Sequence, residues 1–69
     1  MTVIDVIING QPHQFPIGTV LEAALSQWVK PGQRIAVERN GDIVPRSQHA
    51  HTELQHGDQL EIVVAVGGG

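Results

Sequence analysis

Apolar and polar positions alternate with a period of two in three stretches of the chain, which is the pattern of half-buried β-strands. The stretches cover residues 3–8, 34–39 and 59–66. Because Asp5 is expected to face water, the even-numbered residues of the first stretch are expected to face the core. The residues predicted to share the inner face of these strands are Ile4, Val6, Ile8, Ile35, Val37, Leu60, Ile62, Val64 and Val66.

Two Asn-Gly pairs follow the first two stretches and predict tight β-hairpins. Asn9-Gly10 leads into residues 11–15, and Asn40-Gly41 leads into residues 42–44. Pro12 lies in the first returning segment. Because proline has no N–H to donate to a neighbouring strand, we expect this segment to be short or to lie at the edge of the sheet.

A helical period of apolar residues occurs between residues 19 and 29. Thr19 and Glu22 have the spacing of a capping box, so we expect the Thr19 hydroxyl to accept a hydrogen bond from the Glu22 amide. Pro31-Gly32 should end the helix. The apolar stripe predicted to pack on the sheet is Leu21, Ala24, Leu25 and Trp28, with Trp28 interpreted as a core anchor.

Residues 46–55 are polar without a clean period, and we expect a loop with at most one helical turn, held by Leu54. The order hairpin, helix, hairpin, loop, strand predicts an α+β fold. The third or the last strand is free to lie parallel to the first, because the helix provides a crossover. A small mixed sheet packed on one main helix is the ubiquitin-like β-grasp arrangement. We assign residues 1–66 to this domain and residues 67–69 to a flexible tail.

Composition excludes several classes of protein. The 69 residues include no cysteine, which excludes disulfides, thiolate metal sites and cysteine nucleophiles and agrees with a cytoplasmic location. A net charge of −3, scattered basic residues and only two aromatic residues argue against nucleic-acid binding. The first residues lack the pattern of a signal peptide, and no apolar run reaches the roughly 20 residues of a membrane helix.

Four histidines raise the question of a metal site: His13, His49, His51 and His56. Their spacing matches no familiar zinc pattern, so we interpret them as polar residues of which at least one hydrogen-bonds the backbone. Ser47 lies near two of them in sequence but has no scaffold that would orient a catalytic triad. We therefore expect no catalytic residues, no metal and no bound cofactor in this chain, and we expect it not to be an enzyme.

The triplet Gly67-Gly68-Gly69 has two interpretations. In the first it is an inert chain end. In the second it is a thin arm that delivers its α-carboxylate to a partner enzyme, where the carboxylate attacks the α-phosphate of ATP. Glycine suits a narrow channel because it has no Cβ. This chemistry requires no side chain of the chain itself.

The whole chain resembles the sulfur carrier proteins of thiamine biosynthesis, the ThiS family. The residues that carry the resemblance are the early Ile-Ile-Asn-Gly, the run Val-Glu-Arg-Asn-Gly-Asp-Ile-Val-Pro-Arg over residues 37–46, Gly57-Asp58 and the terminal glycines. The family motif needs only a glycine pair, so the resemblance implies a thiocarboxylate on Gly69, a thin neck at Gly68 and no essential role for Gly67.

The resemblance also implies partners. An adenylating enzyme related to ubiquitin-activating enzymes would use ATP, a desulfurase or rhodanese would supply sulfur, and thiazole synthase would receive it. The small subunit of molybdopterin synthase and the ubiquitin-related modifier of tRNA thiolation share the fold and tail, so both pathways remain alternatives. A β-grasp interaction module with an inert tail is the alternative from another class.

Partners should dock on the sheet face that points away from the helix. We predict Ile7, Ala36, Glu38, Val63 and Ala65 on this face, against the alternative of scattered surface apolarity. Arg39 and Arg46 are candidates to pair with a partner carboxylate, against the alternative that both are simply solvated.

Overall fold

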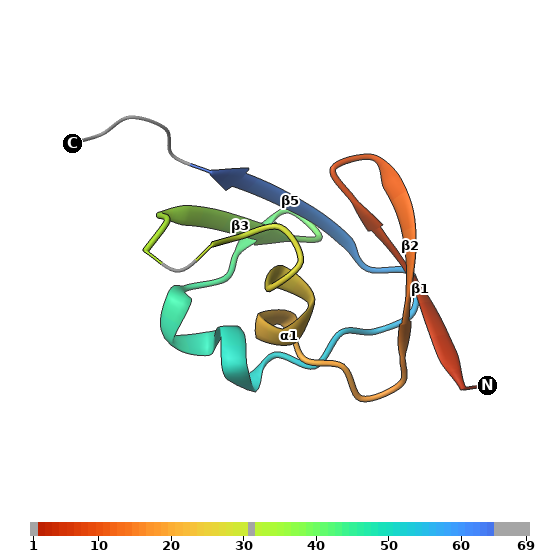
Figure 1. Ribbon diagram of the computed structural model, residues 1–69. Coiled ribbons are helices and arrows are strands. Elements are labelled where there is room, and N and C mark those ends of the chain that lie inside the picture. The colour runs from red at the N-terminus through yellow and green to blue at the C-terminus, as the bar shows by residue number, and fades with distance from the viewer. Residues whose placement is uncertain (1, 31, 65–69) are drawn as a thin grey trace.

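The structure is a computed structural model that describes residues 2–30 and 32–64. A five-stranded sheet is packed on one side by helix α1 and the 3-10 helix η1 (Figure 1). The expectations for Pro31, Ala65, Val66 and the glycine tail lie outside the described residues. The elements are β1 (Val3–Ile8), β2 (Gln11–Pro16), α1 (Leu21–Leu25), β3 (Ile35–Arg39), β4 (Asp42–Ile43), η1 (Arg46–His51) and β5 (Gln59–Val64).

The sheet is mixed, as the order of elements predicted. Its strand order is β2-β1-β5-β3-β4. Strand β5 lies in the centre, parallel to β1 and antiparallel to β3, so the last strand is the one that runs parallel to the first. The proline-containing strand β2 lies at the edge of the sheet, as expected from its missing N–H groups.

The core lies between the sheet and α1. Most of its residues are those that the alternation and the helical stripe indicated, but Phe15 was not predicted, and Ile35 and Val64 are only partly buried. Trp28 is only partly buried and packs against this core, with its ring centroid 4.9 Å from that of His13 in an edge-on arrangement. Trp28 is therefore a border residue of the core. The buried hydrophobic residues are Ile4, Val6, Ile8, Phe15, Leu21, Ala24, Leu25, Val37, Leu54, Leu60 and Ile62.

Both predicted Asn-Gly hairpins are present. In each turn the asparagine and the glycine have positive φ, 50° and 81° at Asn9-Gly10 and 53° and 89° at Asn40-Gly41, as in the turn type that matches strand twist. The Asn9 side chain also binds the central strand, which the sequence pattern did not indicate. Its Oδ1 accepts a 2.7 Å hydrogen bond from the Ile62 amide, and its Nδ2 donates to the Ile62 carbonyl at 3.2 Å.

The capping-box prediction was wrong. Helix α1 begins after Val20 with no side-chain cap, and the Thr19 hydroxyl instead donates to the Pro16 carbonyl at 2.8 Å. The physical reason is that a distant segment satisfies the backbone here. The Leu21 amide donates to the Thr52 carbonyl at 2.7 Å, and the Leu54 amide donates to the Thr19 carbonyl at 2.9 Å. The helix is also shorter than expected: it ends at Leu25, residues 26–28 form turns, and residues 29–30 have no regular secondary structure.

Residues 46–55 were predicted to form a loop with at most one helical turn, and the first six of them instead form the 3-10 helix η1. The side chain of His49 is buried, and its Nε2 donates to the carbonyl oxygen of Val44 at 3.0 Å, which ties η1 to the segment just before it. Leu54 is buried, as the sequence predicted. The segment that connects β4 to β5 thus contributes Leu54 and His49 to the interior of the molecule.

The two hydrogen bonds between the Asn9 side chain and Ile62, which we call the Asn9 clamp, give a first prediction. Asn9→Gly keeps the positive φ accessible but removes both hydrogen bonds to Ile62, so it should lower the free energy of unfolding by about 1–2 kcal/mol. Urea denaturation followed by the fluorescence of Trp28, the only tryptophan, measures this loss. Gln11→Ala, an exposed change on the neighbouring strand, serves as the control. An Asn9→Gly variant as stable as the parent protein would contradict a stabilising role for the clamp.

Candidate functional site: the central strand and the exposed sheet face

Strand β5 leads to the tail, and it lies in the centre of the sheet with a paired strand on each side. Its first residues pair with β1, where Ile7 and Ile8 lie opposite Gln59 and Leu60. From Leu60 onward it pairs with β3, and the last pair joins Ile35 to Val64. The chain therefore reaches residue 64 from the middle of the sheet, beside the first residue of β3 (Figure 1). Any segment beyond Val64 starts from a fixed position.

A buried carboxylate holds the start of this strand. Asp58 precedes β5, and its side chain is 6% exposed. It accepts hydrogen bonds from Arg39 Nε at 2.8 Å, Asn40 Nδ2 at 3.0 Å and the Gln55 amide at 2.8 Å. Burial alone would raise the pKa of Asp58, but these hydrogen bonds and the positive charge of Arg39 outweigh it and hold the pKa below the ordinary value.

The second hairpin turn binds the same region through its asparagine. The Asn40 amide donates to the Gln59 carbonyl at 2.8 Å, and the Gln59 amide donates to Asn40 Oδ1 at 2.9 Å. Asn40 therefore extends the pairing of β3 with β5 by one step beyond the regular ladder. Together with the Asn9 clamp on Ile62, these contacts fix β5 at its start and at its middle.

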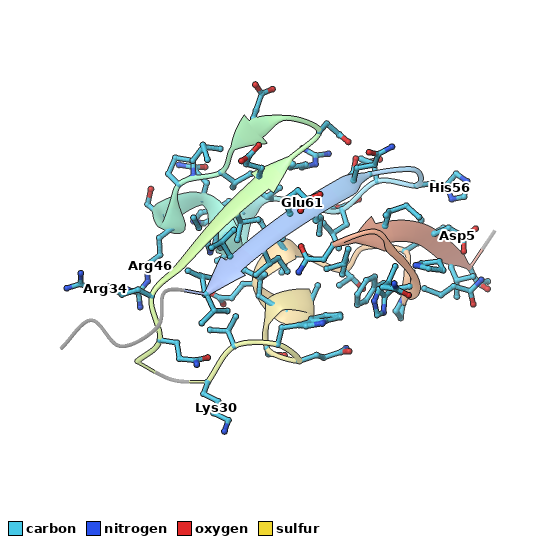
Figure 2. The ribbon with its side chains drawn as sticks, turned by 90° about the horizontal axis from the view of Figure 1, so that it is seen from above. Asp5, Lys30, Arg34, Arg46, His56 and Glu61 are labelled. Carbon is cyan, nitrogen blue, oxygen red and sulfur yellow. The ribbon has the colours of Figure 1, made fainter. Side chains whose placement is uncertain are left out.

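The predicted docking face is partly assembled as expected. Ala36 lies opposite Val63, and both are exposed on the side of the sheet away from α1. Glu38 is exposed on the same face, opposite Glu61, which also faces out (Figure 2). Ile7 is partly buried on β1, on the other side of β5 from Ala36 and Glu38. Ala65 lies outside the described residues.

Sequence reasoning missed one apolar residue of this face. Ile43, on β4, is 63% exposed, as is Val63. Ile43 lies opposite Glu38, so it belongs to the same face, because residues paired across strands point to the same side of a sheet. The two-residue Asn-Gly turn sets this register, so counting outward from the turn would have found it. We call Ala36, Glu38, Ile43 and Val63 the sheet-face patch.

The two candidate arginines do not lie together. Arg39 is half-buried and bound to Asp58 within the molecule, which neither of the two sequence interpretations anticipated. Arg46 is the first residue of η1 and lines a groove formed with α1 and the start of β3. The structure thus joins Arg39 to the support of β5 and separates Arg46 from the sheet-face patch.

The histidines are dispersed over the molecule. The Asp5 amide donates to His56 Nδ1 at 3.1 Å, and His49 binds the Val44 carbonyl, so the interpretation that a histidine bonds the backbone is confirmed. Within residues 2–30 and 32–64, no three histidine, aspartate or glutamate side chains gather in a way that would hold a metal ion. No helix in the described part of the chain is long and apolar enough to cross a membrane.

The class of protein follows from this architecture and from a solved relative. The crystal structure of the thiamine biosynthesis protein ThiS from Geobacter metallireducens matches the fold with a TM-score of 0.77 and 26% sequence identity. The match covers 96% of this chain and 100% of that one. The fold is the ubiquitin-like β-grasp, with a five-stranded mixed sheet and one α-helix in the described part of the chain.

Sequence comparison identifies the family. The profile of the ThiS family matches residues 6–69, so the chain belongs to the ThiS family. The chain is 33% identical over 66 residues to the uncharacterised protein ycf40 of Pyropia yezoensis, and this match covers 96% of the chain and 93% of that protein.

A second kind of relative is much longer. The chain is 41% identical over 66 residues to a thiazole synthase of Paramagnetospirillum magneticum, a match that covers 96% of the chain. It spans only about a fifth of the length of the curated thiazole synthases that it matches, 20% and 19% in two of them.

The Asp58 network gives a prediction on pH dependence. Because the pKa of Asp58 is lowered by folding, its carboxylate stabilises the fold fully above the ordinary pKa of 3.8, and this contribution is lost as pH falls through the lowered value. The free energy of unfolding should therefore decline below about pH 4. Asp58→Asn should cost roughly 2–4 kcal/mol at neutral pH and flatten this decline.

Thermal melts between pH 2 and pH 7 measure both effects. Asp42→Asn, at an exposed carboxylate on β4, is the matched control and should leave the acid decline in place. If Asp58→Asn melts with the same pH profile as the parent protein, the buried carboxylate is not the group responsible.

Proposed function

We propose that this chain is the sulfur carrier for assembly of the thiazole ring of thiamine. The observation that carries this proposal is the match to the ThiS family over residues 6–69, which includes the three terminal glycines. In this role Gly69 bears the reactive carboxylate and Gly68 provides the thin neck. ATP binds to the partner enzyme, so the carrier itself holds no cofactor and catalyses no step.

The proposed chemistry has two steps at the carboxylate of Gly69. An adenylating enzyme related to ubiquitin-activating enzymes binds ATP, and a carboxylate oxygen attacks its α-phosphate while pyrophosphate leaves. In the second step, a persulfide of a desulfurase or rhodanese attacks the acyl carbonyl and displaces AMP. A thiol then attacks the resulting acyl disulfide, which releases the thiocarboxylate and leaves a disulfide. Because glycine has no Cβ, the arm can follow a narrow channel to both reactive centres. We expect these steps in the cytoplasm, where ATP is available.

Thiazole synthase is the proposed acceptor of the sulfur. Support comes from the relatives named thiazole synthase, in which a segment like this chain makes up about a fifth of the polypeptide. A carrier and an acceptor that work on the same sulfur atom gain from such a connection, because covalent linkage raises their effective concentration.

The support of β5 fits this role. A carrier must present its arm in the same position to successive enzymes, and the clamps from Asn9, Asn40 and Asp58 fix the strand from which the arm leaves. We propose that the sheet-face patch beside this strand docks the adenylating enzyme. Its exposed Val63 and Ile43 supply apolar contact area.

The tail hypothesis is tested by intact-mass measurement. Incubated with its adenylating enzyme, ATP and a sulfur donor, the chain should gain the mass that corresponds to replacing one oxygen by one sulfur. Deletion of Gly68-Gly69 should abolish this gain while the melting temperature changes little. An unmodified mass in the presence of a demonstrably active enzyme would refute the proposal, and a large loss of stability on deletion would indicate a structural tail.

The docking face is tested with a pair of matched variants. Val63→Ser should weaken binding to the adenylating enzyme about tenfold, because it removes an apolar side chain from the centre of the patch. Ile17→Ser makes an equivalent change at a residue that is 53% exposed in the connection between β2 and α1, and it should leave affinity unchanged. Titration calorimetry measures both. Equal affinities for the two variants would count against this face.

A further inference from the structure

The positive charges of this acidic chain are not evenly distributed. Of its four lysine and arginine residues, Arg39 is bound to Asp58. The other three, Lys30, Arg34 and Arg46, all line one groove on the helix side of the sheet. A chain with a net charge of −3 therefore has a local cationic surface.

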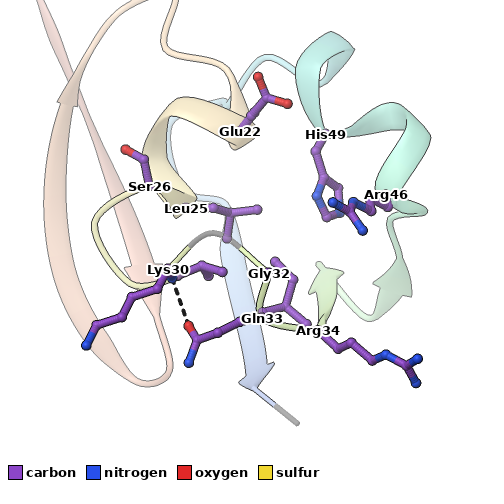
Figure 3. Close-up of a pocket in the computed structure, with 11 residues that line it drawn as sticks. Glu22, Leu25, Ser26, Lys30, Gly32, Gln33, Arg34, Arg46 and His49 are labelled. Atoms are coloured by element: carbon purple, nitrogen blue, oxygen red, sulfur yellow. Dashed lines mark hydrogen bonds between the residues drawn. The ribbon is translucent and has the colours of Figure 1, made fainter.

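The groove lies between α1, the segment that leads into β3, and η1 (Figure 3). Its apolar lining comes from Leu25, Val29 and Ile35. His49 lines it from η1, next to Arg46, while Arg34 and Lys30 extend outward from its edge (Figure 3). A groove with an apolar lining and a cationic edge is suited to an apolar side chain flanked by carboxylates.

The three cations are available to a partner. Their residues are exposed, and within residues 2–30 and 32–64 none of them makes a salt bridge. Glu22 is the one carboxylate among the residues that line the groove. Two of the remaining carboxylates, Glu38 and Glu61, lie opposite each other on the outer face of the sheet. The outer face of the sheet thus carries this pair of carboxylates, whereas the groove is lined by three cations and one carboxylate.

The groove also lies next to the point from which the arm leaves. Ile35, which lines the groove, is paired with Val64, the last described residue of β5. Arg34 precedes Ile35, and Figure 2 shows Arg34 and Arg46 at this same end of the sheet. A protein that receives the chain beyond Val64 must therefore approach the edge of the groove.

We propose that this groove binds an acidic segment of thiazole synthase when that enzyme receives the arm. An apolar side chain of the segment packs on Leu25, Val29 and Ile35, and carboxylates beside it pair with Arg34 and Arg46. This inference rests on the proposed function. Thiazole synthase is the partner assigned because carrier-like sequence occurs within relatives of that name. The groove then provides a contact separate from the sheet-face patch.

The test uses the full chain and the purified thiazole synthase from the same genome. Arg34→Gln and Arg46→Gln each remove one positive charge from an exposed residue of the groove. Gln11→Glu changes the net charge by the same amount on edge strand β2, away from the groove, and is the matched control. Each arginine variant should bind about three- to tenfold more weakly and show a smaller salt dependence, whereas the control should bind like the parent protein.

Several outcomes would overturn the inference. If the arginine variants bind thiazole synthase as tightly as the parent protein, the inference is wrong. It is also wrong if the variants lose affinity only for the adenylating enzyme. Sedimentation of the carrier alone tests whether it self-associates. If the arginine substitutions abolish self-association but leave binding to the synthase intact, the groove binds a second copy of the chain. Thermal melts of each variant check that the fold is retained.

The experiment separates this inference from the proposed function. If the parent chain gains sulfur and binds thiazole synthase while the arginine variants bind equally well, only the groove assignment fails. If the parent chain neither gains sulfur nor binds the synthase, the proposed function fails, and the groove assignment fails with it.

Discussion

The buried carboxylate of Asp58 is the interaction on which the arrangement of the sheet depends. It joins the end of β3 through Arg39, the second hairpin turn through Asn40, and the connection before β5 through Gln55. A buried charge with three donors is stable only while all of them stay in place, because losing one leaves an incompletely compensated charge in the interior. The network therefore couples the position of β3 to that of β5, and through β5 to β1, since no other strand lies between them.

Much of the fold could be predicted from the sequence because its signals are local. Alternation with a period of two identified the inner faces of β1, β3 and β5, and the Asn-Gly pairs identified both hairpins. The failures involve contacts between distant segments. The capping box at Thr19 has a correct local pattern, but the Leu21 amide binds Thr52, a residue that no local pattern relates to it. The clamp by Asn9 was missed for the same reason, since its partner Ile62 lies 53 residues away.

The residues of the candidate site likewise fall into those that local patterns predicted and those that they missed. Ala36, Glu38 and Val63 were predicted together because alternation places them on one side of a sheet. Ile43 was missed because a strand of two residues has no period to read. The arginines show most clearly what could not be predicted from the sequence. A sequence gives their charge but not their partner, so Arg39, bound to Asp58, and Arg46, at the groove, could not be told apart.

The central place of β5 has a consequence for how the molecule is made. Hairpins β1–β2 and β3–β4 lie on opposite sides of β5 and are joined in the sheet only through it. Without β5 the two hairpins would have no strand pairing in common. Pairings of such large sequence separation favour slow, concerted assembly. The position of Val64, where β5 ends, is therefore set only after the domain has folded. Under the proposed function, an enzyme that binds both the sheet-face patch and the chain beyond Val64 would select the folded protein over the unfolded one.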